Sequence, residues 1–110
     1  MTPDAAEVWV GCQNPLAFRH AVADALDMDV EQVTFHNHTM GGGFGRRANP
    51  DVAVQAALLS RATGTPIKLI WSREEDVRRD HYRPAVLSEF RAVLDDSGNP
   101  EAWELSLIHI

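Results

Sequence analysis

The sequence is poor in cysteine, in long apolar runs and in positive charge. Cys12 is the only cysteine of the 110 residues, so a disulfide framework or a cysteine-based zinc site within this chain is excluded. No apolar run approaches the roughly 18 residues of a membrane span, and residues 1–10 lack the charged-then-apolar pattern of a signal peptide. The net charge of −6 argues against general nucleic-acid binding, which depends on neutralising phosphates.

What the chain does contain is the pattern of one α+β domain, or of part of one. The composition is 45% hydrophobic and 24% charged, which is ordinary for a globular protein. Residues 7–13 and 32–40 alternate as strands, and Asn14 with Pro15 predicts the start of a helix over residues 15–26.

The second half of the chain continues this alternation. Asn49 and Pro50 predict another helix start, and residues 50–62 are apolar on nearly all sides, which is typical of a buried helix. The remaining elements are predicted as a buried strand at 67–71, a helical turn with a capping box at 72–75, and a hairpin of strands 86–94 and 101–109. The predicted fold is therefore a mixed sheet with two main helices and a C-terminal hairpin, without a dividing linker.

Four of the seven glycines surround one phenylalanine in the stretch GGGFGRR, residues 41–47. The stretch lies between a strand end and a helix start, where backbone N–H groups could receive a phosphate or another oxyanion. It does not match the phosphate-binding loop of nucleotide hydrolases, and the dinucleotide-binding pattern fails at Arg46. Two interpretations stay open: a tight connection with Phe44 buried in the core, or a loop held by the ring while its N–H groups serve a ligand.

Three stretches together resemble the large, molybdenum-binding subunit of the xanthine dehydrogenase/aldehyde oxidase family. They are VWVGCQNP at 8–15, VTFHNHTMGGGFGRR at 33–47 and AALLSRATGTPIKLIWSREEDVRRDHYRP at 56–84. The two arginines after GGGFG and the segment WSREEDVRRDHYRP are most similar to the isoquinoline 1-oxidoreductase branch. The resemblance covers about residues 7–104 and implies that residues 1–110 are a fragment of a larger molybdenum-cofactor-binding domain.

The resemblance implies a molybdenum–pterin cofactor, and it leaves the cytosine dinucleotide form of the pterin open. Gln13 corresponds to a glutamine that donates a hydrogen bond to an oxygen ligand of molybdenum. An amide and backbone N–H groups suit this task because they donate hydrogen bonds without competing for the metal. Arg46 and Arg47 are left open between cofactor phosphate, substrate, and mere contact with solvent and neighbouring acids. Cofactor contacts are implied for Gln13, Gly42, Gly43, Phe44, Gly45 and Arg46.

The resemblance also implies an activity, namely hydroxylation of a small-molecule substrate with oxygen from water. Electrons would pass to a separate small iron–sulfur subunit of the 2Fe–2S type. Ala48 stands where purine-oxidising members carry a substrate-binding glutamate, so an uncharged N-heterocycle or an aldehyde is the implied substrate. The general base of the family is a glutamate far toward the C-terminus of the subunit, and no segment here matches it. The fragment is therefore expected to be inactive alone, and residues 106–110 are predicted to be a non-native tail.

Several other interpretations stay open. A non-catalytic phosphate- or partner-binding module is the alternative function, and the compartment is open between cytoplasm and periplasm. His36 and His38 have a spacing that suits a metal, but no third ligand is evident, so surface or hydrogen-bonded core histidines are favoured. Cys12 is predicted to be a small buried thiol, and Trp71 and Trp103 are predicted to lie in the core. The arginines and acids of residues 73–83 are predicted to pair with one another at the surface.

Overall fold

The computed structural model describes residue 2 and residues 4–109. The chain divides into two units, Met1–Asp80 and His81–Ile110. The first unit holds two parallel strands and three α-helices, and the second is an antiparallel hairpin. The predicted α+β class is confirmed, with its strands arranged as two separate two-stranded sheets.

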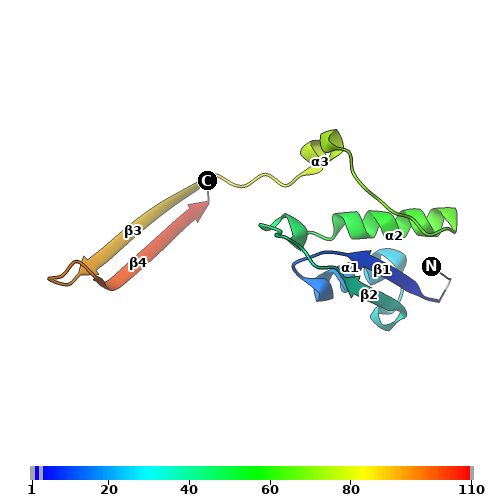
Figure 1. The fold of residues 1–110 in the computed structure, drawn as a ribbon, viewed down its shortest axis with the longest axis horizontal. Helices are drawn as coiled ribbons and strands as arrows, with labels where there is room; N and C mark the ends of the chain where they lie inside the picture. The colour runs from blue at the N-terminus through cyan, green and yellow to red at the C-terminus, as the bar shows by residue number, and fades with distance from the viewer. Residues whose placement is uncertain (1, 3, 110) are drawn as a thin grey trace. The chain divides into compact units, whose positions relative to one another are not determined.

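A strand–helix–strand motif forms the centre of the first unit (Figure 1). Strands β1 (Ala6–Val10) and β2 (Val33–Asn37) are parallel, with Ala6 opposite Val33 and Val10 opposite Asn37. Helix α1 (Pro15–Leu26) and the 3-10 turn η1 (Val30–Gln32) connect them. Because the strands are parallel, the segments that follow their carboxyl ends start at the same edge of the sheet.

Local chemistry accounts for the position of α1. The Asn14 side chain accepts a hydrogen bond from the Ala17 N–H at 3.2 Å, and Pro15 occupies the first turn, where no backbone donor is needed. The helix ends at Asp27, whose φ of 51° is left-handed and whose N–H is donated back to the last turn. The predicted helix over residues 15–26 is confirmed.

The core of the first unit is small and consists of one face of α1, the inner face of the sheet and two alanines of the second helix. Phe18 is 1% exposed, and its ring meets that of Phe35 edge-on at 6.2 Å between centroids. The buried residues are Ala6, Cys12, Phe18, Val22, Ala23, Leu26, Val33, Ala53 and Ala57.

Helix α2 (Asp51–Thr63) follows the 3-10 turn η2 (Arg46–Ala48) and differs from its prediction. It begins after Pro50 rather than after an Asn49 cap, and it ends at Gly64, whose φ is 66°. The expectation of a buried helix was wrong, since Leu58 and Leu59 are 37% and 44% exposed. The side of α2 that packs on the core of this unit carries the buried Ala53 and Ala57 and the partly buried Val54.

The predicted buried strand at 67–71 is also absent. These residues have no regular secondary structure, and Ile70 is 74% exposed. A strand needs a neighbour to accept its backbone hydrogen bonds, and none of the described strands lies in register with this segment. Helix α3 (Arg73–Arg79) follows, and the Ser72 hydroxyl accepts the Glu75 N–H as predicted. The surface pairing is confirmed by two ion pairs, Arg73–Asp76 and Arg79–Glu75.

The second unit confirms the predicted hairpin. Strands β3 (Val86–Leu94) and β4 (Pro100–His109) are antiparallel, with Phe90 opposite Leu105 and Ala92 opposite Trp103. The Asp95 carboxylate closes the turn by accepting the Asn99 N–H at 2.8 Å and the Ser97 N–H at 2.9 Å. These contacts, chiefly those from Asn99, hold the pKa of Asp95 below its ordinary value.

Two predictions fall on this hairpin. The core position predicted for Trp103 was wrong, since its side chain is 76% exposed. Residues 106–109 of the predicted non-native tail continue β4, where Ser106 pairs with Glu89, whereas Ile110 lies outside the described residues. None of the helices in the described part of the chain has the length and apolar character of a membrane span.

Candidate functional site: the glycine loop and Gln13

The structure brings Gln13 against the glycine loop, although the two are far apart in sequence. Gln13 follows β1 and the loop follows β2, so the parallel pairing places both at the carboxyl edge of the sheet. The Gln13 Oε1 accepts a hydrogen bond from the Gly45 N–H at 3.0 Å. The Gln13 N–H is donated to the carbonyl of Arg47 at 2.9 Å, so both the backbone and the side chain of Gln13 contact this segment.

Gly43 lies so close to Gln13 that a side chain would not fit between them. A Cβ on Gly43 would lie 2.7 Å from Cδ and 2.8 Å from Cγ of Gln13. Carbon atoms do not approach to these distances in folded proteins, so glycine is required for the contact. Gly41, by contrast, has open space where a Cβ would be.

Phe44 occupies the tip of the loop, and its ring is 85% exposed. The interpretation that it is buried in the core was therefore wrong, whereas the interpretation that the ring holds the loop while its N–H groups serve a ligand stays a prediction. The ring lies against Gly42, where a Cβ would come within 2.9 Å of a ring carbon. Phe44 has a φ of 48°, which is rare for a residue with a side chain, and Gly45 follows with a φ of 91°.

Arg46 is paired with acids on two other segments. Its Nη1 and Nη2 donate to the two oxygens of Asp51 at 3.2 and 3.0 Å, and its Nε lies 2.7 Å from Oδ1 of Asp80. The guanidinium also lies over the ring of Trp71, at 5.4 Å from the centroid. The hydrogen bonds that Arg46 donates to Asp51 raise the pKa of Arg46 above its ordinary value. Of the roles left open for this arginine, contact with neighbouring acids is the one the structure shows.

Asn37 and Arg47 complete the attachment of the segment after β1, and sequence reasoning had given neither this task. Asn37 accepts the Cys12 N–H at 2.9 Å and donates to the Cys12 carbonyl at 3.4 Å. Arg47 donates to the carbonyl of Gly11 at 3.0 Å. The pattern that could have drawn attention to Asn37 is its position on the same strand face as Val33 and Phe35, although the residue itself is exposed.

Cys12 confirms its prediction as a buried thiol, with 2% of the residue exposed. Burial raises its pKa above the ordinary value, against smaller lowering effects from the Asn14 backbone and the charge of Arg47. We expect Cys12 in the folded chain to react with iodoacetamide at pH 8 at least roughly tenfold more slowly than in the urea-unfolded chain. Equal rates, measured by mass spectrometry, would contradict its buried position.

The same shift predicts how stability depends on pH. The folded thiol has a higher pKa than the unfolded one, so the fold favours the protonated form. This contribution is complete below the pKa of the unfolded thiol and is lost as the pH rises through the folded pKa. The Cys12→Ser variant should therefore lose less stability than the parent chain between neutral and alkaline pH.

His36 lies in β2 and His38 directly follows the strand. Neither forms a metal site with other residues of the described chain. His36 stacks on Trp9 with 4.9 Å between ring centroids and lies 3.4 Å from Glu7 Oε1. No group of three potential ligands surrounds His36 or His38 within the described ranges. The favoured interpretation as surface histidines agrees with the exposure of both.

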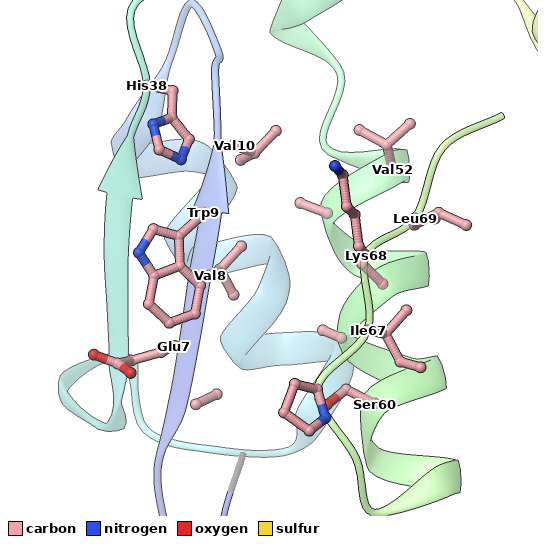
Figure 2. A pocket seen from close by; sticks show the side chains of 15 residues that line it. Glu7, Val8, Trp9, Val10, His38, Val52, Ser60, Ile67, Lys68 and Leu69 are labelled. Atoms are coloured by element: carbon pink, nitrogen blue, oxygen red, sulfur yellow. The ribbon is translucent and has the colours of Figure 1, made fainter.

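An apolar groove of about 660 Å³ runs along β1 (Figure 2). Val8 and Val10 of β1 lie on one side of it, and Val52 of α2 and residues 66–69 lie on the other. None of the six residues assigned to the cofactor from sequence lines this groove. The apolar groove along β1 and the glycine loop are therefore separate features of the first unit.

Comparison with known proteins shows which family the chain belongs to. The sequence profile of the molybdopterin cofactor-binding domain matches residues 2–109. The chain belongs to this family. Its membership confirms the resemblance drawn from GGGFGRR and Gln13, and it confirms molybdopterin as the cofactor of the domain. The cytosine dinucleotide form is not decided by this match.

The relatives of this chain described next are named as oxidoreductases. The isoquinoline 1-oxidoreductase subunit beta of Brevundimonas diminuta is 40% identical over 89 residues, which cover 81% of this chain. The membrane-bound aldehyde dehydrogenase (pyrroloquinoline-quinone) of Gluconacetobacter polyoxogenes is 35% identical over 89% of the chain. Aldehyde oxidase 2 of Rattus norvegicus is 29% identical over 90% of it. The matched region spans 11%, 13% and 8% of these relatives, respectively.

Proposed function

We propose that this chain forms one wall of the cofactor pocket in a molybdenum hydroxylase that oxidises an uncharged N-heterocycle or an aldehyde. The observation that carries the proposal is the hydrogen bond between Gly45 N–H and Gln13 Oε1. It occupies the acceptor end of the Gln13 amide and so orients the side chain. The donor end, Nε2, then faces away from Gly45 and is available to an acceptor on a bound group.

The residues at this edge suit the oxygen-rich centre of a molybdopterin cofactor. The Gln13 amide is a neutral donor that does not compete for the metal. Gly45 leaves open space where a side chain would otherwise stand, so a ligand can approach the backbone closely. The exposed ring of Phe44 can exclude water on the same side once a ligand is present.

When bound, the cofactor supplies oxygen transfer from water and accepts two electrons from the substrate. This chain contributes binding and orientation. Gln13 and the loop of Gly42, Gly43, Phe44 and Gly45 hold the cofactor, and Arg46 supports the loop. We propose that the general base lies elsewhere in the longer subunit and that electrons leave through a small iron–sulfur subunit. The names of the relatives, an isoquinoline oxidoreductase among them, support the substrate class.

A simple phosphate-binding module is less well supported. Such a module would need free cations beside the loop, but Arg46 is paired with Asp51 and Asp80. Arg47 is partly engaged by the carbonyl of Gly11. The neutral donors at this edge fit a metal–oxygen centre better than a multiply charged phosphate.

The test is cofactor retention in the full-length subunit that contains this chain. The Gln13→Ala variant should retain about tenfold less molybdenum and pterin after dialysis, since one hydrogen bond to a charged or polarised acceptor is worth roughly 1–2 kcal/mol. Metal analysis by mass spectrometry and pterin fluorescence after oxidation measure the two components.

Gln32→Ala is the matched control for this variant. Gln32 is also a glutamine with a hydrogen-bonded side chain, but it precedes the amino end of β2, opposite the loop. Its replacement should leave cofactor content unchanged. Absence of both molybdenum and pterin from active wild-type protein would refute the proposed function.

A further inference from the structure

We propose that Arg46 is a positioning residue that fastens the glycine loop to helices α2 and α3, and that it does not itself contact the cofactor. The proposal deepens the proposed function, because it assigns a separate task to a residue within the same loop. It starts from the contacts of one side chain with Asp51, Asp80 and Trp71.

Arg46 donates hydrogen bonds through Nη1 and Nη2, whereas its buried Nε makes no hydrogen bond and approaches Asp80 only as an ion pair. The two-pronged pair with Asp51 reaches the first residue of α2, and that carboxylate also accepts the Val52 N–H at 3.0 Å. The Nε lies 2.7 Å from Asp80, which directly follows α3. One side chain thus connects the loop to two helices at once.

Trp71 supports the same arrangement. The Arg46 guanidinium lies over its ring at 5.4 Å, and the indole N–H is donated to Gln55 Oε1 of α2 at 3.0 Å. Arginine fits this environment because it combines a planar fork for carboxylates with a flat face for an aromatic ring. Lysine would keep the charge but lose both features.

The fastening to α2 and α3 adds to the contacts that hold the loop to the segment after β1, which come from Gln13 and from Arg47 with Gly11. The loop contains four glycines within five residues, and Phe44 at its tip does not enter the core. Its internal hydrogen bonds are short-range, from Arg46 N–H to the Gly43 carbonyl and from Ala48 N–H to the Gly45 carbonyl. A glycine-rich loop that samples many conformations would lose the Gly45–Gln13 contact, on which the orientation of the Gln13 amide depends.

Direct binding of an anion by Arg46 is the alternative role. An incoming phosphate would have to compete with two carboxylates that already lie within hydrogen-bond distance. It would also lie between acids that repel it. The arrangement therefore favours a positioning role over a ligand contact.

Amide hydrogen exchange in the cofactor-free chain tests this role. In Arg46→Lys, the Gly45 and Ala48 amides should exchange about tenfold faster than in the parent, whereas the His38 amide should not change. His38 N–H is donated to Val10 at 3.1 Å, so it reports the nearby strand pair independently of Arg46. Asp80→Asn, which keeps Arg46 and Asp51, should accelerate the two loop amides by a smaller factor.

Arg61→Lys is the matched control, since it makes the same substitution at an exposed position of α2. It should leave all three amides unchanged. Unchanged loop amides in both Arg46→Lys and Asp80→Asn would overturn the proposal. So would an equal acceleration of His38, because that result indicates general destabilisation.

The outcome is independent of the proposed function, because no cofactor is present in this experiment. In the full-length subunit, Arg46→Lys should then lower pterin content with Gln13 intact. Loop acceleration without any cofactor loss would overturn the link to binding while leaving the cofactor assignment of Gln13 to its own test.

Discussion

Replacing Phe18 with alanine is expected to unfold the first unit under conditions in which the parent chain is folded. Phe18 is 1% exposed and its ring packs on that of Phe35. Removing a buried phenylalanine costs roughly 3–5 kcal/mol, which approaches the whole stability of a typical small domain, about 5–15 kcal/mol. Urea denaturation followed by circular dichroism measures the change.

Leu16→Ala provides the comparison on the same helix. Leu16 is 63% exposed, so its truncation should change the free energy of unfolding by no more than about 0.5 kcal/mol. Similar urea midpoints for the two variants would show that α1 does not bury the face that contains Phe18, Val22 and Leu26.

Replacing Gly43 with alanine is expected to abolish cofactor retention with little loss of stability. The added Cβ would lie within 2.8 Å of Cγ and Cδ of Gln13. The Gln13 side chain is exposed and flexible, so it can move aside at a cost of about 1 kcal/mol or less. Its displacement breaks the contact with Gly45 and turns the amide away from the cofactor. We expect molybdenum and pterin in the full-length subunit to fall at least roughly tenfold.

Gly41→Ala makes the same substitution two residues earlier in the loop. Nothing lies within 4 Å of the position that its Cβ would take, so cofactor content should stay at the parent level. Equal loss in both variants would indicate that loop flexibility matters rather than the Gln13 contact. Full retention in Gly43→Ala would show that Gln13 is not oriented by this approach.

The starts of α1 and α3 could be predicted because they depend on neighbours in the sequence. Asn14 and Ser72 cap α1 and α3 with hydrogen bonds that span three residues, and glycine or aspartate ends the helices through local backbone conformation. Such interactions form whatever the rest of the fold is, so a short stretch of sequence is enough to predict them. The hairpin of β3 and β4 belongs to the same class, since its turn is closed by Asp95 and Asn99.

The errors lie where an element depends on distant partners. Residues 67–71 have the composition of a buried strand, but a strand forms only where another strand accepts its hydrogen bonds. The apolar surface of α2 predicted burial on all sides, whereas this unit covers only the side that contains Ala53 and Ala57. Trp103 likewise has a large apolar side chain with no core to enter.

The candidate site shows the same division. Resemblance identified Gln13 and the glycine loop, but not that Oε1 of Gln13 accepts the Gly45 N–H. That contact exists because β1 and β2 are parallel, which brings the ends of both strands to one edge. The role of Arg46 was open in the sequence, since Asp51 lies five residues away but Asp80 lies beyond α3 and meets Arg46 only in the folded chain.

By itself the sequence determined the bounds of α1, the hairpin, the burial of Cys12 and the membership of a molybdopterin-binding family, because each depends on adjacent residues or on a recognisable motif. Only the tertiary structure decided that the Oε1 end of the Gln13 amide accepts the Gly45 N–H and that Asp80 lies beside Arg46. Hydrogen bonds and ion pairs act over about 3 Å, so partners separated by more than thirty residues can be assigned only once the chain has brought them together.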